Sequence, residues 1–242
     1  MEKTHSIWYV TLVLSAIAGY CDTVTFISAD SIFSAHVTGN FIVFAYQIIN
    51  GSNAQVWIKL LTFPVFIISV IIGGRLGAEP GKRYRLLLME GFLIVAAGLL
   101  ALFFKLYSPT SWGTYLVTMV VVFAMGFQNA FGKLYGKETY GPTTMMTGNV
   151  TQASLDLGNV LGSAFTDLLS LESLKKQMIT IGGFLIGCLL GATMANFFGL
   201  YVLILPGLVL LTCYYTTEQH DDQATFAGQS GVTSSQTLPP AV

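Results

Sequence analysis

Long apolar segments dominate this sequence, and they constrain its fold more than any other feature. Eight of them follow one another, at about 7–28, 35–49, 56–77, 84–105, 112–132, 144–162, 177–198 and 199–216. Most are near the roughly 20 residues that a helix needs to cross a bilayer. Only 10% of the residues are charged, against about 25% in an ordinary soluble domain, so the chain cannot supply a soluble protein's polar surface. We therefore expect an all-α, polytopic helical membrane protein.

A change in composition divides the chain into two parts. Residues 1–216 form a single predicted transmembrane domain. From about Thr217 the sequence is rich in Asp, Gln, Ser, Thr, Gly and Pro, and such segments cannot bury enough apolar surface to fold. We expect residues 217–242 to be a disordered polar tail. Within the domain, a basic cluster between Arg75 and Arg85 predicts a cytoplasmic loop by the positive-inside rule.

The two halves of this domain, at about 7–105 and 112–216, resemble each other. Gly19-Tyr20-Cys21-Asp22 matches Gly126-Phe127-Gln128-Asn129, and a Thr-Gly-Asn follows in each half, at 38–40 and at 147–149. We expect two related four-segment repeats, each with a short helix that begins at its Thr-Gly-Asn. Four full spans per half would make the repeats parallel, whereas one re-entrant segment per half would make them inverted. The sequence leaves both arrangements open.

The paired Thr-Gly-Asn motifs are the strongest candidates for a binding site. Thr and Asn cap helices, and Gly permits close approach of backbone or ligand. A helix that begins inside the membrane presents free N–H groups and a partial positive charge, which can bind anionic groups. The alternative is that both motifs only cap helices and pack close crossings. The predicted substrate-binding residues, which include two amides beside the second motif, are Thr38, Gly39, Asn40, Gln128, Asn129, Thr147, Gly148 and Asn149.

Asp22 is the candidate coupling or gating residue. It lies about 15 residues into the first apolar segment, and a carboxylate within a membrane is costly unless it faces a cavity or a partner. It could carry a proton, which would couple transport to pH. The alternative is a structural carboxylate near the membrane edge, hydrogen-bonded to Thr23, Thr25 or a neighbouring helix.

Several function classes lack the residues that they need. The net charge of −1 gives no basic surface for nucleic acid. The three histidines are widely spread and the three cysteines lie apart within apolar runs, so we expect no metal site. No hydrolase, phosphate-loop or dinucleotide motif is present. We therefore expect no enzymatic activity, no catalytic residue and no cofactor.

Asp22, the two Thr-Gly-Asn motifs and Gly126-Phe127-Gln128-Asn129 together resemble the YoaK-like family of bacterial multi-pass membrane proteins. The resemblance covers about residues 7–216. It implies a protein of the bacterial inner membrane with a suggested permease role, and it implies no established substrate.

We thus expect a transporter of a small polar or anionic solute, with lipid and that solute as partners and a homo-oligomer left open. The competing hypothesis is a non-transporting membrane scaffold or assembly protein that uses the same motifs for helix packing.

Overall fold

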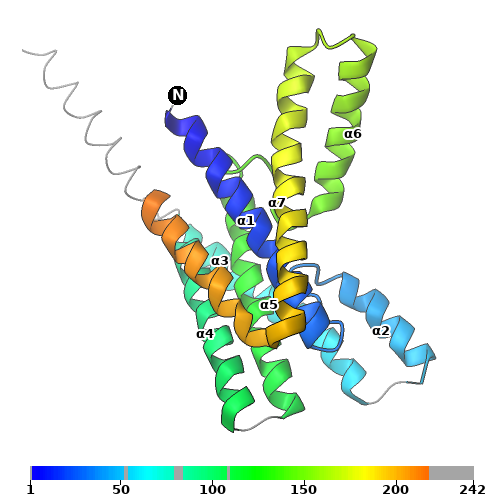
Figure 1. Cartoon of the computed structure of the whole chain (residues 1–242), viewed down its shortest axis with the longest axis vertical. Coiled ribbons are helices and arrows are strands. Elements are labelled where there is room, and N and C mark those ends of the chain that lie inside the picture. The colour runs from blue at the N-terminus through cyan, green and yellow to red at the C-terminus, as the bar shows by residue number, and fades with distance from the viewer. Residues whose placement is uncertain (1, 52–53, 79–83, 108–109, 218–242) are drawn as a thin grey trace, which may run out of the picture.

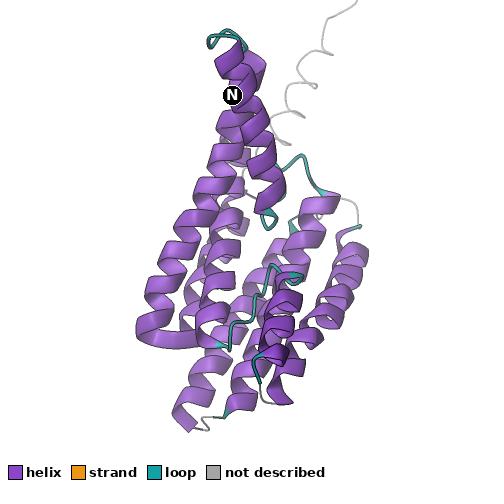
Figure 2. Cartoon of the chain, turned by 90° about the vertical axis from the view of Figure 1, so that its right-hand side faces the viewer, coloured by secondary structure: helices purple, strands orange, loops and turns teal. Residues whose placement is uncertain are grey.

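The computed structural model describes residues 2–51, 54–78, 84–107 and 110–217, which form helices joined by loops (Figure 1). The helices of the first half are α1 (Glu2–Ser28), α2 (Gly39–Ile49), the short 3-10 helix η1 (Ala54–Trp57), α3 (Ile58–Gly77) and α4 (Arg85–Tyr107). Those of the second half are α5 (Ser111–Leu134), α6 (Met146–Gly162), α7 (Leu168–Phe198), the 3-10 helix η2 (Gly199–Leu203) and a final helix over 204–217. No strand occurs among the described residues (Figure 2), which confirms the predicted all-α class.

Five helical stretches in the described part of the chain are long and apolar enough to cross a membrane. They are Ile7–Ser28, Gln55–Gly77, Arg85–Tyr107, Ser111–Leu134 and Leu168–Thr217. The last of these covers 50 residues and contains both α7 and the final helix. α2 and α6, with 11 and 17 residues, fall short of a full crossing. The protein therefore has the architecture of a multi-pass membrane protein with two short helices, one in each half.

The boundaries of three predicted segments differ from the structure. The segment predicted at 35–49 becomes a helix only at Gly39. The segment predicted at 177–198 begins much earlier, at Leu168. Thr217, which was assigned to the disordered tail, ends the final helix, whereas the rest of that predicted tail, 218–242, lies outside the described residues.

Close approaches between helices fix their relative directions. α1 and α7 run parallel, because contacting positions ascend together along both helices: Leu12 with Gly183, Ala16 with Gly187, and Tyr20 with Gly191. α3 and α5 are also parallel, with contacts that ascend in the same way: Ser69 with Gly126, Gly73 with Ala130, and Gly77 with Leu134.

The other closely packed helix pairs are antiparallel. α4 is antiparallel to α5, since Phe104 meets Gly113 at one end while Tyr84 meets Phe131 at the other. α4 is likewise antiparallel to the final helix, where the contacts are Gly98 with Ile204 and Gly91 with Leu211. After α7 the chain turns back into the final helix (Figure 1). As a result α1, α4 and α7 point one way and α3, α5 and the final helix point the other way.

This arrangement places three of the candidate site residues, Asp22, Gln128 and Asn129, on the two central helices, α1 and α5. α1 and α5 are the most buried of the candidate spans, each with 67% of its apolar window inside the protein. α2 lies at the edge of the bundle, where it packs against α3 and η1, while α6 packs along α7 in a hairpin that projects from one end (Figure 1). The short helices are therefore peripheral, and at their starts Asn40 and Asn149 are buried whereas Thr38 and Thr147 are exposed.

Candidate functional site

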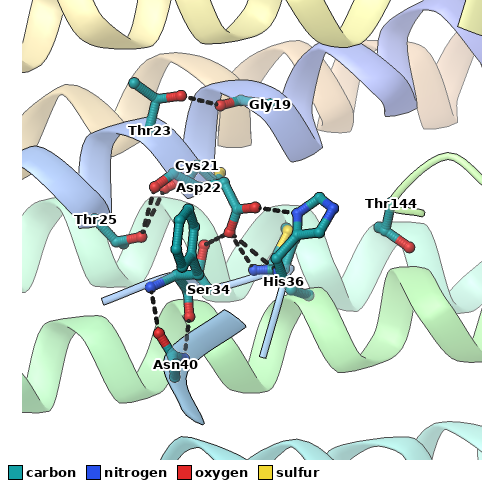
Figure 3. A network of polar contacts seen from close by, with 12 residues as sticks. Gly19, Cys21, Asp22, Thr23, Thr25, Ser34, His36, Asn40 and Thr144 are labelled. Atoms are coloured by element: carbon teal, nitrogen blue, oxygen red, sulfur yellow. Dashed lines mark hydrogen bonds and ion pairs between the residues drawn. The ribbon is translucent and has the colours of Figure 1, made fainter. Parts of the chain in front are cut away.

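Asp22 lies on α1 and binds the loop that leads into α2. The residue is 3% exposed. Its Oδ1 accepts hydrogen bonds from the backbone N–H of Ala35 (2.5 Å) and of His36 (3.3 Å), and from the Ser34 hydroxyl (3.4 Å). Its Oδ2 lies 2.5 Å from Nδ1 of His36 (Figure 3). One buried carboxylate thus holds three consecutive residues of the loop against α1.

A reversal of the chain after α1 makes these contacts possible. Asp30 and Ser31 adopt left-handed backbone conformations, with φ of 53° and 58°, and the Ser31 N–H donates to the Phe26 carbonyl (3.0 Å). Lys59 of α3, fully buried, places its Nζ 2.6 Å from Asp30. The chain then returns alongside α1 to Asp22, which lies about 9 Å inside the helix end at 1.5 Å per residue. The segment before α2 therefore folds back into the helix bundle, and we call it the re-entrant loop.

Asn40 of the first Thr-Gly-Asn motif holds the same loop from the other side. Its Nδ2 donates to the Phe33 carbonyl (2.8 Å) and to the Thr62 hydroxyl (3.1 Å), and its Oδ1 accepts from the Phe33 N–H (2.8 Å). Thr38 is exposed and its side chain caps nothing. A Cβ at Gly39 would lie 3.1 Å from the Phe33 ring. Within this motif, Asn40 is a structural clamp and Thr38 is open to a ligand.

The second motif clamps its own loop at the same sequence spacing. Asn149 Nδ2 donates to the carbonyl of Pro142 (2.7 Å), seven residues earlier, just as Asn40 does to Phe33. Thr147 and Gly148 are exposed, and a Cβ added to Gly148 would meet no atom within 4 Å. α6 begins at Met146, so this motif lies inside the first helical turn and its Thr and Gly are accessible.

Gln128 and Asn129 of α5 hold the loop that leads into α6. Gln128 is 1% exposed and donates from Nε2 to the Leu14 carbonyl and to the Thr143 hydroxyl, both at 2.8 Å. Asn129 Oδ1 accepts from the Thr144 hydroxyl at 2.8 Å. These contacts tie the second loop to α5 as Asp22 ties the first loop to α1.

The two tethers differ in charge. A carboxylate holds the first loop, and its hydrogen bonds are charge-assisted and therefore about twice as strong as neutral ones. A neutral amide, Asn129, holds the second loop. The first loop is therefore held through a carboxyl group and the second through an amide.

The pairing of His36 with Asp22 was not predicted from the sequence. The His36 side chain is 36% exposed, and its ring centroid lies 5.6 Å from that of Phe184 on α7. The two partners are 14 residues apart in sequence and meet only because the loop re-enters. The sequence signal that could have indicated this pairing was the position of a titratable His just before the first Thr-Gly-Asn motif.

Two further buried charged residues were not predicted as site residues. Lys59 is fully buried and pairs with Asp30. Glu90 of α4 is also fully buried, and within the described residues neither of its carboxyl oxygens has a hydrogen-bond partner. Both lie within apolar helices outside the Thr-Gly-Asn motifs. They were missed because the site prediction from the sequence was based on those motifs.

A family model described as "Protein of unknown function (DUF1275)" matches residues 10–216. The chain is a member of the DUF1275 family. This match confirms the resemblance inferred from the paired motifs at the level of the family, and it covers the described helices except the first turns of α1 and Thr217. The search of curated proteins gave no match, and neither did the search of solved structures. For this DUF1275 protein, function must therefore be inferred from the site itself.

Proposed function

We propose that this DUF1275 protein is a permease for a small polar or anionic solute, and that Asp22 and His36 form its pH-sensitive gate. The observation that carries the proposal is the buried carboxylate of Asp22, which holds the re-entrant loop before α2. A polar side chain placed within a membrane at such a cost marks a functional site by default.

The gate involves α2, a short helix that packs against α3 and η1 at the edge of the bundle. This helix has only 11 residues, and much of its side-chain surface is exposed, with Ile42 at 75%, Tyr46 at 67% and Ile49 at 83%. When Asp22 takes up a proton, its oxygens become poorer acceptors and the ion pair with His36 is lost. The loop then loosens from α1, and α2 can move with it.

Matching contacts in the two halves support an inverted-repeat arrangement. Gly19 on α1 packs against the backbone of Phe184 on α7, and Gly126 on α5 packs against that of Phe66 on α3. The first helices of the two halves, α1 and α5, run in opposite directions. So do the helices that follow the two short helices, α3 after α2 and α7 after α6. Transporters built from inverted repeats commonly bind solute at broken or short helices near the bilayer midplane.

The open groups of the two motifs supply the contacts to the solute. Thr38, Thr147 and Gly148 are exposed, whereas Asn40 and Asn149 are occupied by their own loops. The Asp22 carboxylate already occupies the start of the first loop. The negative end of a solute is therefore better accommodated at the start of α6, where the tether is neutral and the first helical N–H groups are free of acidic side chains.

One observation favours the competing scaffold function. Asn40 and Asn149 act in the structure as loop clamps, which a non-transporting assembly protein would also need. The two functions differ in whether the purified protein alone moves a solute.

Reconstituted liposomes separate these functions. We expect the parent protein to take up at least one solute from a panel of small anions, amino acids and nucleobases, at a rate that depends on pH. Asp22→Asn should abolish that pH dependence, because Asn is nearly isosteric and does not titrate. Glu172→Gln, at an exposed position of α7 outside the site, is the matched control and should behave like the parent. Absence of uptake for the whole panel, or an unchanged pH profile in Asp22→Asn, would favour the scaffold.

Gly148→Val tests the position of the solute. Because a Cβ at Gly148 has open space around it, the variant should fold normally while the added bulk obstructs the start of α6. We expect uptake to fall by at least tenfold with an unchanged melting temperature. Normal uptake by a normally folded variant would remove α6 from the solute path.

A further inference from the structure

A cavity of about 430 Å³ lies away from both Thr-Gly-Asn motifs, at the end of the bundle where α4 ends and α5 begins. Ligand pockets typically enclose about 300–1,000 Å³, so its size suits a small molecule or a lipid headgroup. Its walls come from the ends of four helices, α1, α4, α5 and α7, and from η2. We call it the vestibule, and its lining includes Ser28, Phe104, Lys105, Ser111, Thr114 and Tyr201.

The charge of the vestibule is positive. Lys105 is its one ionisable cation, and none of its lining residues is acidic. Lys105 Nζ lies 4.4 Å from the centroid of the Tyr201 ring, a cation–π contact that positions the ammonium. In the described part of the chain no carboxylate pairs with Lys105, so its charge is available to a ligand.

Hydrogen-bond donors also line the vestibule. Thr110 caps α5 by accepting from the Gly113 N–H (3.2 Å), while the N–H groups of Ser111 and Trp112, in the first turn, have no partner in the helix. The Ser28 hydroxyl is buried and has no hydrogen-bond partner among the described residues. These hydroxyl and N–H donors, together with a helix N-terminus and an ammonium, match the chemistry of an oxyanion.

The other walls of the vestibule are apolar. Phe104, Phe198, Leu200 and Val117 line it beside the donors. An anion with no apolar part would leave this surface exposed to water, whereas an ester with an alkyl chain would cover it.

We propose that the vestibule binds a phosphate ester that carries an apolar chain, with the phosphate held by Lys105 and the start of α5. Two sources share this chemistry: a soluble alkyl phosphate and the headgroup of an anionic phospholipid. The site does not depend on the permease proposal, because none of its residues belongs to the Asp22 tether or to the Thr-Gly-Asn motifs.

Two probes distinguish the sources. Hexyl phosphate, titrated by calorimetry into delipidated protein in a neutral detergent, represents the soluble ligand. Phosphatidylglycerol, compared with zwitterionic phosphatidylcholine by native mass spectrometry, represents the lipid. Binding of hexyl phosphate would indicate a soluble ligand, and selective retention of phosphatidylglycerol alone would indicate a lipid site.

Variants of Lys105 locate the binding. Lys105→Gln should weaken whichever probe binds by about tenfold, whereas Lys105→Arg, which keeps the charge, should retain it. Lys133→Gln is the matched control, because it removes a lysine from the opposite end of α5. Lys105 is exposed, so each variant should fold. The proposal is overturned if neither probe binds the parent protein, or if Lys105→Gln binds as tightly as the parent does.

Discussion

Asn40 and Asn149 occupy the same place in their motifs but hold their loops with different strength. Asn40 makes three hydrogen bonds, two of them to the backbone of Phe33. Asn149 makes one good hydrogen bond, to Pro142, and a long contact to the Met146 sulfur (3.9 Å). The second clamp therefore contributes less to stability than the first.

Alanine substitutions should show this difference. We expect Asn40→Ala to lower the free energy of unfolding by about 2–3 kcal/mol, because it leaves the backbone N–H and C=O of Phe33 unpaired, and Asn149→Ala by about 1 kcal/mol. Thr38→Ala, whose side chain caps nothing, should change it by less than about 0.5 kcal/mol. Thermal unfolding in detergent, followed by tryptophan fluorescence, gives the order. Equal losses for both asparagines would contradict the assigned clamps.

At this scale the sequence indicated which residues matter better than it indicated what they do. Asp22 could be singled out because a carboxylate within an apolar run is costly. Its partners could not, since they depend on the left-handed turn at Asp30 and Ser31, which no glycine marks. Asn40 was predicted to contact a solute, and its bonds to Phe33 arise from the same re-entrant loop. Its role as a ligand stays a prediction.

Among the elements, the crossing of α1 and α7 depends on glycines. Gly187 lies directly against the Ala16 carbonyl, so a Cβ there would collide with backbone, while Gly182, earlier in the same helix, has no atom within 4 Å of such a Cβ.

Alanine at each position tests this crossing. Gly187→Ala should destabilise the protein by about 1–3 kcal/mol or force the helices apart. Gly182→Ala should be neutral or stabilising by up to about 1 kcal/mol, because Ala is the better helix former. Melting temperatures measured side by side decide it. A tolerated Gly187→Ala would mean that the two helices are not in this close contact.

The start of α7 was predicted too late because its first turns are not apolar. Residues 168–176 include Glu172, Lys175 and Lys176, and Glu172 pairs with Lys176 at 2.7 Å. Asp167 caps the helix, accepting from the N–H groups of Leu169 and Ser170 at 3.1 Å. A search for apolar runs misses such a segment, whereas the capping Asp was a readable signal.

This cap should make the stability of α7 depend on pH. The hydrogen bonds, that from the Ser170 hydroxyl foremost, lower the pKa of Asp167 below its ordinary value. Its stabilisation is therefore complete above the unfolded-state pKa and is lost as the pH falls through the lowered folded-state pKa. Asp167→Ala should melt below the parent at neutral pH, and the difference should vanish in acid. A difference that persists in acid would show that charge and capping by Asp167 are not its cause.

For the whole molecule, the sequence predicted the class and the approximate number of helices but left the relation of the halves open. That relation depends on whether the short segments cross the membrane. The loop before α2 turns back at Asp30 and leaves only 11 residues for the helix. Such a reversal depends on tertiary contacts, among them the buried Lys59–Asp30 pair, so hydropathy alone could not reveal it.

The most direct test of the gate is the distance between α2 and the bundle as a function of pH. Spin labels at Tyr46 on α2 and Leu116 on α5, both exposed, would be measured by pulsed electron paramagnetic resonance. The native cysteines would first be replaced by alanine, at Cys21, Cys188 and Cys213.

In the parent protein we predict a narrow distance distribution at neutral pH that broadens as the pH falls, because protonation of Asp22 releases the loop before α2. In Asp22→Asn the distribution should no longer depend on pH. A parent distribution that stays the same throughout the range, or a pH response that survives in Asp22→Asn, would contradict the assignment of Asp22 as the gate.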